Sequence, residues 1–158
     1  MHRIGIVGLG HLGEIHLKQW LEIVSKESVM CFDTDIERLE KLTDQYQVSK
    51  IEDYARLLDF ATIIDVVTPT QFHHYYAAEA LRAEKHVFIE KPVCQSMEEI
   101  DELINLQKKS ETLVQIGHVE RYNPAFKAVE SKIFQPKFFE VHRLAPFVAR
   151  GTEVSVIM

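Results

Sequence analysis

The sequence predicts an α/β fold, with a doubly wound parallel sheet followed by the start of an incomplete α+β second domain. Three observations predict this fold class. Short apolar runs alternate with amphipathic helical patterns as far as residue 117. The runs are apolar at consecutive positions, which is typical of parallel strands that are covered on both faces. A glycine-rich turn at residues 8–13 separates the first run from the first helical pattern.

The expected elements follow in chain order. Strands are expected at residues 3–7, 29–33, a short stretch at 48, 63–67, 86–89 and 113–117. Helices are expected from the glycine turn to 24, then up to 46, and over 53–58, 72–82 and 97–109. Asp35 suits the N-cap of the second helix, and Ser-Met-Glu-Glu over 96–99 has the form of a capping box.

The alternation stops near residue 118. A helix is expected over 124–134, where Asn123 offers an N-cap and Pro124 takes the first helical position. A strand of a different, antiparallel sheet is expected over 137–144. We therefore predict two domains, a parallel-sheet domain over 1–118 and a truncated second domain over 119–158. The apolar run over 154–158 at the end of the chain also suggests a fragment, because an exposed hydrophobic edge invites association.

Composition and charge narrow the function. The chain has 158 residues, of which 46% are hydrophobic and 27% charged, as expected of a globular domain. The formal net charge is −6 and lysine and arginine are scattered, which argues against nucleic acid or an anionic membrane as the main partner. A small-molecule partner is expected instead. Cys31 and Cys94 form no C-x-x-C pair and are expected to be reduced, buried thiols of a cytoplasmic protein.

The glycine turn predicts a dinucleotide site of the Rossmann type. It consists of Gly8, Leu9, Gly10, His11, Leu12 and Gly13. A strand, a glycine turn and a helix N-terminus together place backbone N–H groups and the positive end of a helix dipole where a pyrophosphate can bind. Glycines with this spacing also occur in turns that bind nothing.

Asp33 makes the interpretation more specific. It ends the second expected strand, twenty residues after Gly13, where a carboxylate can accept the two ribose hydroxyls of an adenosine. Its charge would repel a 2′-phosphate, and no arginine follows at once to receive one. The expected cofactor is therefore NAD rather than NADP.

Three further motifs carry a family resemblance. They read Asp-Val-Val-Thr-Pro-Thr-Gln-Phe-His over 65–73, Lys-His-Val-Phe-Ile-Glu-Lys-Pro over 85–92 and Gly-His-Val-Glu-Arg-Tyr-Asn-Pro over 117–124. With the glycine turn, they resemble the successive signatures of the Gfo/Idh/MocA oxidoreductases and cover nearly the whole chain. The last motif, followed by Val-His-Arg-Leu-Ala-Pro over 141–146, resembles the branch that includes the UDP-N-acetylglucosamine 3-dehydrogenases.

The resemblance implies roles for several residues. The cofactor site would include Thr68, Pro69, Thr70, His73, Glu90 and Lys91. The family commonly has asparagine where Thr70 stands, which leaves that contact open. His73 and His74 could equally be a helix-start pair that binds no ligand, and as adjacent residues they do not suggest a metal site. His16 on the first helix is expected to pack or hydrogen-bond within the fold.

Lys91 is the candidate catalytic residue. At the end of a strand beside the nicotinamide, its ammonium could bind the substrate hydroxyl and stabilise the charge that develops on this oxygen. The family often has a cis peptide before the following proline. The alternative is an ordinary solvated lysine. His118, Arg121 and Tyr122 are expected to bind substrate, and an arginine suits a diphosphate. Their alternatives are an interior histidine, a hinge salt bridge and a core aromatic residue.

The implied function is that of an NAD-dependent dehydrogenase. It would transfer hydride between the nicotinamide and a hydroxyl or ketone of a sugar or nucleotide sugar, and the full-length protein would form a homo-oligomer. The family's second domain adds an acidic residue and, four positions later, an acid–base histidine, so the 158-residue chain alone is expected to be inactive. The alternatives are a non-catalytic dinucleotide-binding module and a family oxidoreductase that acts on a non-sugar substrate.

Overall fold

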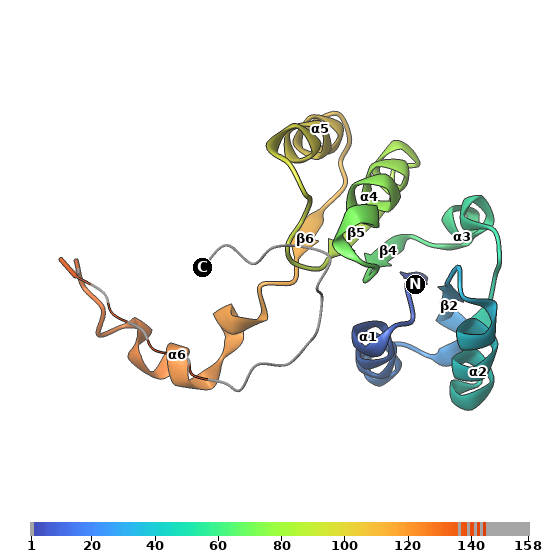
Figure 1. The fold of residues 1–158 in the computed structure, drawn as a ribbon, viewed down its shortest axis with the longest axis horizontal. Helices are drawn as coiled ribbons and strands as arrows, with labels where there is room; N and C mark the ends of the chain where they lie inside the picture. The colour runs from blue at the N-terminus through green and yellow to red at the C-terminus, as the bar shows by residue number, and fades with distance from the viewer. Residues whose placement is uncertain (1, 136, 139, 141, 143, 145–158) are drawn as a thin grey trace. The chain divides into compact units, whose positions relative to one another are not determined.

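A computed structural model describes residues 2–135, 137, 138, 140, 142 and 144. It confirms the doubly wound parallel sheet (Figure 1). The strands are β1 (Ile4–Val7), β2 (Val29–Phe32), β3 (Ser49–Lys50), β4 (Ile63–Val66), β5 (His86–Ile89) and β6 (Val114–Ile116). The helices are α1 (His11–Ile23), α2 (Ile36–Tyr46), α3 (Tyr54–Phe60), α4 (His73–Arg82), α5 (Met97–Lys108) and α6 (Pro124–Glu130). Short 3-10 helices cover Lys26–Ser28 (η1), Thr70–Phe72 (η2) and Val119–Tyr122 (η3).

The six strands lie in the order β3-β2-β1-β4-β5-β6, and every neighbouring pair is parallel. The chain moves outward from β1 in one direction and then returns to place β4 on the other side of it. The loops after β1 and β4 therefore leave the sheet in opposite directions and open a crevice at their carboxyl ends. Ligands of open α/β sheets bind at this point.

Two hydrophobic clusters cover the two faces of the sheet. One joins residues of the strands to α3, α4 and α5, through side chains such as Leu57, Ala77 and Leu103. The other joins the strands to α1 and α2, through Leu17 and Leu39. All four residues of β1 are buried, as expected of a central parallel strand that is covered on both faces.

The helix starts confirm the capping predictions. The Asp35 carboxylate accepts the N–H of Arg38 at the start of α2. The Ser96 hydroxyl accepts the N–H of Glu99, but the Glu99 carboxylate accepts the N–H of Gln95 rather than that of Ser96. The reciprocal bond of the capping box is therefore displaced by one residue, from the N–H of Ser96 to that of Gln95.

Some predicted boundaries were wrong. The third strand begins after residue 48, because Gln47 adopts a left-handed conformation with φ 56° and Val48 donates back to the Thr43 carbonyl. Helix α6 ends at Glu130 rather than at 134, because the bonds that follow are i→i−3 turns from Lys132 and Ile133.

The chain divides after Gly117 into two compact units, Met1–Gly117 and His118–Met158. The strand predicted over 137–144 lies partly outside the described residues, and the apolar run over 154–158 lies entirely outside them. Both stay predictions.

Candidate functional site

The glycine turn connects β1 to α1 under tight steric constraints. Gly8 has φ +94°, a conformation that side chains with a Cβ rarely adopt. A Cβ on Gly13 would lie 2.0 Å from the Gly8 carbonyl oxygen, so this position of α1 can only be glycine. Gly10, by contrast, is the N-cap of α1, and a Cβ at this position would have no atom within 4 Å. The helix start is thus open on the side from which a phosphate could approach.

Asp33 is tied to this turn by the backbone. Its Oδ2 accepts the N–H of Leu9 at 2.6 Å and its Oδ1 accepts the N–H of Asp35 at 2.8 Å. The residue is only 6% exposed, so the chain holds its carboxylate at the end of β2 in one orientation. The spacing in the sequence predicts that Asp33 lies near the turn, and in the structure its carboxylate contacts the turn at Leu9.

Sequence reasoning missed two basic residues near Asp33. The guanidinium of Arg38, one turn into α2, lies 3.4 Å from Asp33 Oδ2 and 2.8 Å from Asp35 Oδ2. Arg38 and Lys41 also line a hollow next to the glycine turn. The hollow is lined by Leu9, Gly10, His11, Glu14, Arg38, Lys41 and Leu42. Their spacing on the helix that follows Asp33 was the available signal, because residues three apart share a face.

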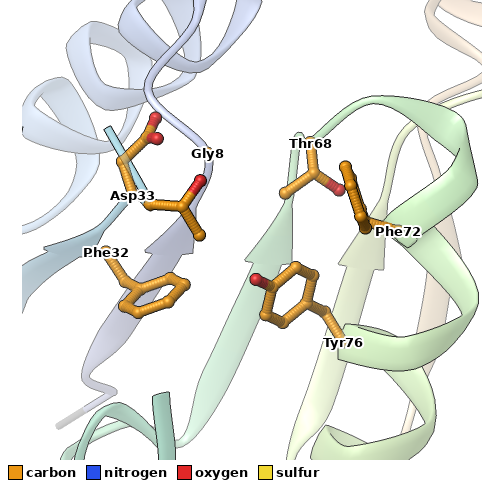
Figure 2. A pocket seen from close by; sticks show the side chains of 7 residues that line it. Gly8, Phe32, Asp33, Thr68, Phe72 and Tyr76 are labelled. Atoms are coloured by element: carbon orange, nitrogen blue, oxygen red, sulfur yellow. The ribbon is translucent and has the colours of Figure 1, made fainter. Parts of the chain in front are cut away.

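A pocket opens on the other side of Asp33, at the crevice between β1 and β4 (Figure 2). It is lined by Gly8, Phe32, Asp33, Thr34, Thr68, Phe72 and Tyr76. Figure 2 shows Phe32 and Asp33 on one side of it, facing Thr68, Phe72 and Tyr76. The Phe32 and Tyr76 rings contact each other, with centroids 5.9 Å apart. Burial is the main reason that the pKa of Tyr76 lies above its usual value, so its hydroxyl stays neutral.

The hydroxyl of Thr68 is the observation that points to a ligand. It is buried, and no hydrogen-bond partner for it is present among the described residues. Buried polar groups are nearly always paired, so a hydroxyl left over at the edge of a pocket indicates a missing partner. Pro69 is exposed next to it, and Thr70 begins η2.

The His73 side chain is buried between two loops and faces backbone carbonyls. It is 1% exposed, and its ring nitrogens lie 2.8 Å from the Thr68 carbonyl oxygen and 2.9 Å from the Pro92 carbonyl oxygen. Both nitrogens are therefore occupied by the backbone. The imidazole links the loop after β4 to the loop after β5, and the geometry favours the interpretation without a ligand. Its neighbour His74 pairs with Glu102 on α5.

Glu90 and Lys91 follow β5 at the same edge of the sheet. Glu90 is 6% exposed, and its Oε2 accepts the N–H of Lys91 at 3.1 Å. A Cβ on Gly117 would lie 2.1 Å from Glu90 Oε1, so the carboxylate occupies space that only a glycine leaves free. Lys91 itself is exposed, and the peptide between Lys91 and Pro92 is cis.

The remaining predicted residues, His118, Arg121 and Tyr122, belong to the second unit and are all exposed. Tyr122 is 66% exposed and has the Lys127 ammonium 5.1 Å from its ring centroid. Both cysteines are free and buried, and burial is the main reason that their pKa values rise, to about 12 for Cys31 and about 11 for Cys94.

Two kinds of feature are absent from the described residues. None of the helices described is long and apolar enough to cross a membrane. No group of three or more His, Cys, Asp or Glu side chains in the part of the chain that the structure describes could hold a metal ion.

Comparison with known proteins decides the family. Residues 2–118 match the model of the GFO_IDH_MocA oxidoreductase family, which has an NAD-binding Rossmann fold. The chain belongs to this family. Its glycine turn, Asp33 and Thr68 thus lie in the fold that gives the Gfo/Idh/MocA oxidoreductases their NAD site.

Individual relatives of this Gfo/Idh/MocA chain are dehydrogenases. UDP-N-acetylglucosamine 3-dehydrogenase of Acidithiobacillus ferrooxidans is 33% identical over 157 residues, which are 99% of this chain and 50% of the relative. The NAD-dependent scyllo-inositol 2-dehydrogenase of Bacillus subtilis is 28% identical, over 83% of this chain and 40% of the relative. The chain therefore spans half or less of the length of these curated relatives.

Solved structures of family dehydrogenases have a similar fold. The structure of the Acidithiobacillus ferrooxidans UDP-N-acetylglucosamine 3-dehydrogenase gives a TM-score of 0.76 at 29% identity, over 83% of this chain and 43% of that one. The scyllo-inositol dehydrogenase of Lactobacillus casei, with bound NAD(H) and scyllo-inositol, gives a TM-score of 0.74 at 25% identity, over 83% and 40%.

Proposed function

We propose that this chain binds NAD at the carboxyl edge of its sheet and serves an NAD-dependent dehydrogenase that acts on a sugar or nucleotide sugar. The unpaired Thr68 hydroxyl carries the proposal, because it lies in the pocket beside Asp33 at the crevice of an NAD-binding fold. The residues present fit the cofactor. The open start of α1 suits the diphosphate, and the Asp33 carboxylate suits the ribose hydroxyls.

The position of each group indicates which part of NAD it would contact. Phe32 and Tyr76 give the pocket apolar walls that suit a purine ring, and Thr68 can donate to it or to the neighbouring ribose. Arg38 and Lys41 add positive charge next to Gly10, where a diphosphate would lie. A carboxylate at Asp33 would repel a 2′-phosphate, which favours NAD over NADP.

Lys91 is the proposed catalytic residue. NAD, when bound, supplies the hydride acceptor for an alcohol substrate. The exposed ammonium of Lys91 would donate a hydrogen bond to the substrate oxygen and stabilise the negative charge that this oxygen acquires when its proton passes to a base, the role that the resemblance assigns to a histidine of the family's second domain. Glu90 and His73 hold the backbone on either side of this lysine, through the Lys91 N–H and the Pro92 carbonyl.

The substrate class rests on the relatives. The relative with 33% identity is a UDP-N-acetylglucosamine 3-dehydrogenase, and another acts on scyllo-inositol. We assign residues 1–118 to cofactor binding and 119–158 to a substrate or oligomerisation domain, in which His118, Arg121 and Tyr122 would contact the substrate. We expect the complete protein to be a homo-oligomer.

Calorimetric titration of the chain with NAD and NADP tests the cofactor site. We expect NAD to bind more tightly than NADP. Asp33→Asn should weaken NAD binding about tenfold or more, since a hydrogen bond to a charged group contributes about 1.5–3 kcal/mol. Asp35→Asn is the matched control, because asparagine caps a helix as well as aspartate does. Absence of NAD binding by the folded chain would overturn the proposal.

An assay of NADH formation tests the reaction. We expect the 158-residue chain to show little or no turnover with UDP-N-acetylglucosamine, and the protein encoded by the complete gene to reduce NAD. Lys91→Ala in that protein should abolish turnover while it still binds NAD. Normal turnover by residues 1–158 would show that no second domain is needed, and an active Lys91→Ala variant would remove the lysine from the mechanism.

A further inference from the structure

Three titratable side chains from distant parts of the sequence meet directly behind the Glu90–Lys91 turn. His16 comes from α1, Asp65 from β4, and Glu90 from the end of β5. The Nδ1 atom of His16 lies 3.0 Å from Asp65 Oδ2, and its Nε2 atom lies 3.5 Å from Glu90 Oε1. The imidazole thus stands between two carboxylates, and the prediction that His16 hydrogen-bonds within the fold is confirmed.

Asp65 anchors one end of this group. It is 0% exposed in the central strand β4, and its Oδ2 accepts the indole N–H of Trp20 at 2.6 Å as well as facing His16. A buried carboxylate is very costly unless it is paired and hydrogen-bonded. Two donors from successive turns of α1 meet that need.

Glu90 connects the other end to the proposed active site. One carboxylate oxygen faces His16, and the other accepts the N–H of Lys91. Gly117 leaves the space that the carboxylate fills. Any change that moves the Glu90 side chain therefore acts on the backbone of the candidate catalytic lysine.

The charges indicate which form of His16 is present. Burial is the largest influence and lowers the pKa of His16. The hydrogen bond and charge of Asp65 and the charge of Glu90 together outweigh it, so that the pKa is raised above the ordinary 6.5. The edge of the Phe88 ring is a further neighbour, 5.6 Å from the imidazole. Cys31 on β2 feels the Asp65 charge, but its raised pKa of about 12 keeps the thiol neutral.

We propose that His16, held as an imidazolium between Asp65 and Glu90, is a positioning residue that fixes the Glu90–Lys91 turn. This proposal rests on the function proposed above for Lys91. With both ring nitrogens protonated, His16 donates to a carboxylate on each side. When it loses a proton, one carboxylate loses its donor and its counter-charge. Because Asp65 is the more deeply buried and has Trp20 as well, Glu90 is the group that is released.

The first experiment needs no cofactor. NMR titration of the His16 ring in the free chain should give a midpoint above 6.5, and Glu90→Gln should lower that midpoint. Trp20 is the single tryptophan of the chain, and its N–H donates to Asp65, so its fluorescence should change with the same midpoint. A His16 midpoint at or below 6.5, or one that Glu90→Gln leaves unchanged, would overturn the proposal.

The second experiment measures NAD affinity from about pH 6 to about pH 9. In the native chain, affinity should fall at least about threefold as His16 loses its proton. His16→Gln should show weak binding whose remaining pH dependence no longer includes that step. His74→Gln is the matched control, because His74 pairs with Glu102 away from this group and should keep the native profile.

Gly117→Ala provides a variant that leaves His16 intact. Its Cβ would meet the Glu90 carboxylate, so it should weaken NAD binding at low pH as His16→Gln does. If NAD binds with the same pH profile in native and His16→Gln chains, the positioning role is wrong and the proposed function stands. If the native chain does not bind NAD at all, the proposed function fails. The titration without ligand still tests whether His16 is charged between the two carboxylates.

Discussion

The carboxyl edge of the sheet is built in two different ways on its two sides. On the β1–β2 side, the Asp33 carboxylate is held by main-chain N–H groups of Leu9 and Asp35. On the β4–β5 side, the Glu90 carboxylate faces a histidine that is itself held by a second carboxylate, Asp65. The shortest bonds to the carboxylate come from two main-chain N–H groups on the first side, whereas on the second side the carboxylate lies between one main-chain N–H and a buried histidine.

The difference has a physical consequence. Backbone N–H groups do not titrate near neutral pH, so the donors on the first side do not change there. The second side depends on a histidine, whose charge changes near neutral pH. The proposed nucleotide site and the proposed catalytic lysine have different needs. The first would require a fixed geometry, whereas the second would lie where proton transfer takes place.

Breaking the backbone side should have the largest effect. Gly13→Ala would place a Cβ 2.0 Å from the Gly8 carbonyl oxygen, and neither backbone can move away cheaply. We expect a loss of about 3 kcal/mol or more in the free energy of unfolding, although alanine is the better helix former. Urea denaturation measures it. Gly10→Ala is the control, because its Cβ meets nothing within 4 Å, and it should change stability by less than about 1 kcal/mol.

Removing the His73 link between the β4 and β5 loops should come next. His73→Ala would remove the imidazole that lies between the carbonyls of Thr68 and Pro92 and would open a cavity in a 1% exposed site. We expect a loss of about 2–4 kcal/mol, measured by urea denaturation. His74→Ala should cost less than about 1 kcal/mol, since it removes only a partly exposed ion pair with Glu102. Equal losses in the two variants would contradict the structural role of His73.

A helix cap tests the backbone side with a smaller effect. Asp35→Ala removes the acceptor for the Arg38 N–H at the start of α2, and we expect a loss of about 1 kcal/mol by the same measurement. Asp35→Asn keeps an acceptor there and should cost less than about 0.5 kcal/mol. If both substitutions are equally costly, the ion pair between Asp35 and Arg38 is the more important interaction.

The smallest expected effect is the pH dependence of stability that His16 gives to the β4–β5 side alone. The folded-state pKa of His16 is raised above its ordinary 6.5, so its contribution to stability is fully present below pH 6.5. It is lost as pH rises through the raised folded-state value. Urea denaturation of native and His16→Gln chains at several pH values should show this loss in the native chain alone. The stabilisation is small because burial lowers the pKa of His16 while the two carboxylates raise it.

Local patterns were enough to predict much of the fold and of the nucleotide side. Consecutive apolar residues, cap residues such as Asp35 and the glycine turn each depend on neighbours within a few positions. The distance from Gly13 to Asp33 is likewise set by one helix and one strand. The boundaries that failed lie where a turn follows a helix, at the start of β3 after Gln47 and at the end of α6 after Glu130.

The sequence by itself determined the order of strands and helices along the chain, the glycine turn and, to within a residue or two, where the strands end. Only the tertiary structure decided what those residues contact. It buried His73 between two backbone carbonyls, placed Arg38 against Asp33, and set His16 between Asp65 and Glu90. The reason is that strand and helix formation depends on near neighbours, whereas the pairing of buried charges depends on which distant side chains the packed sheet brings together.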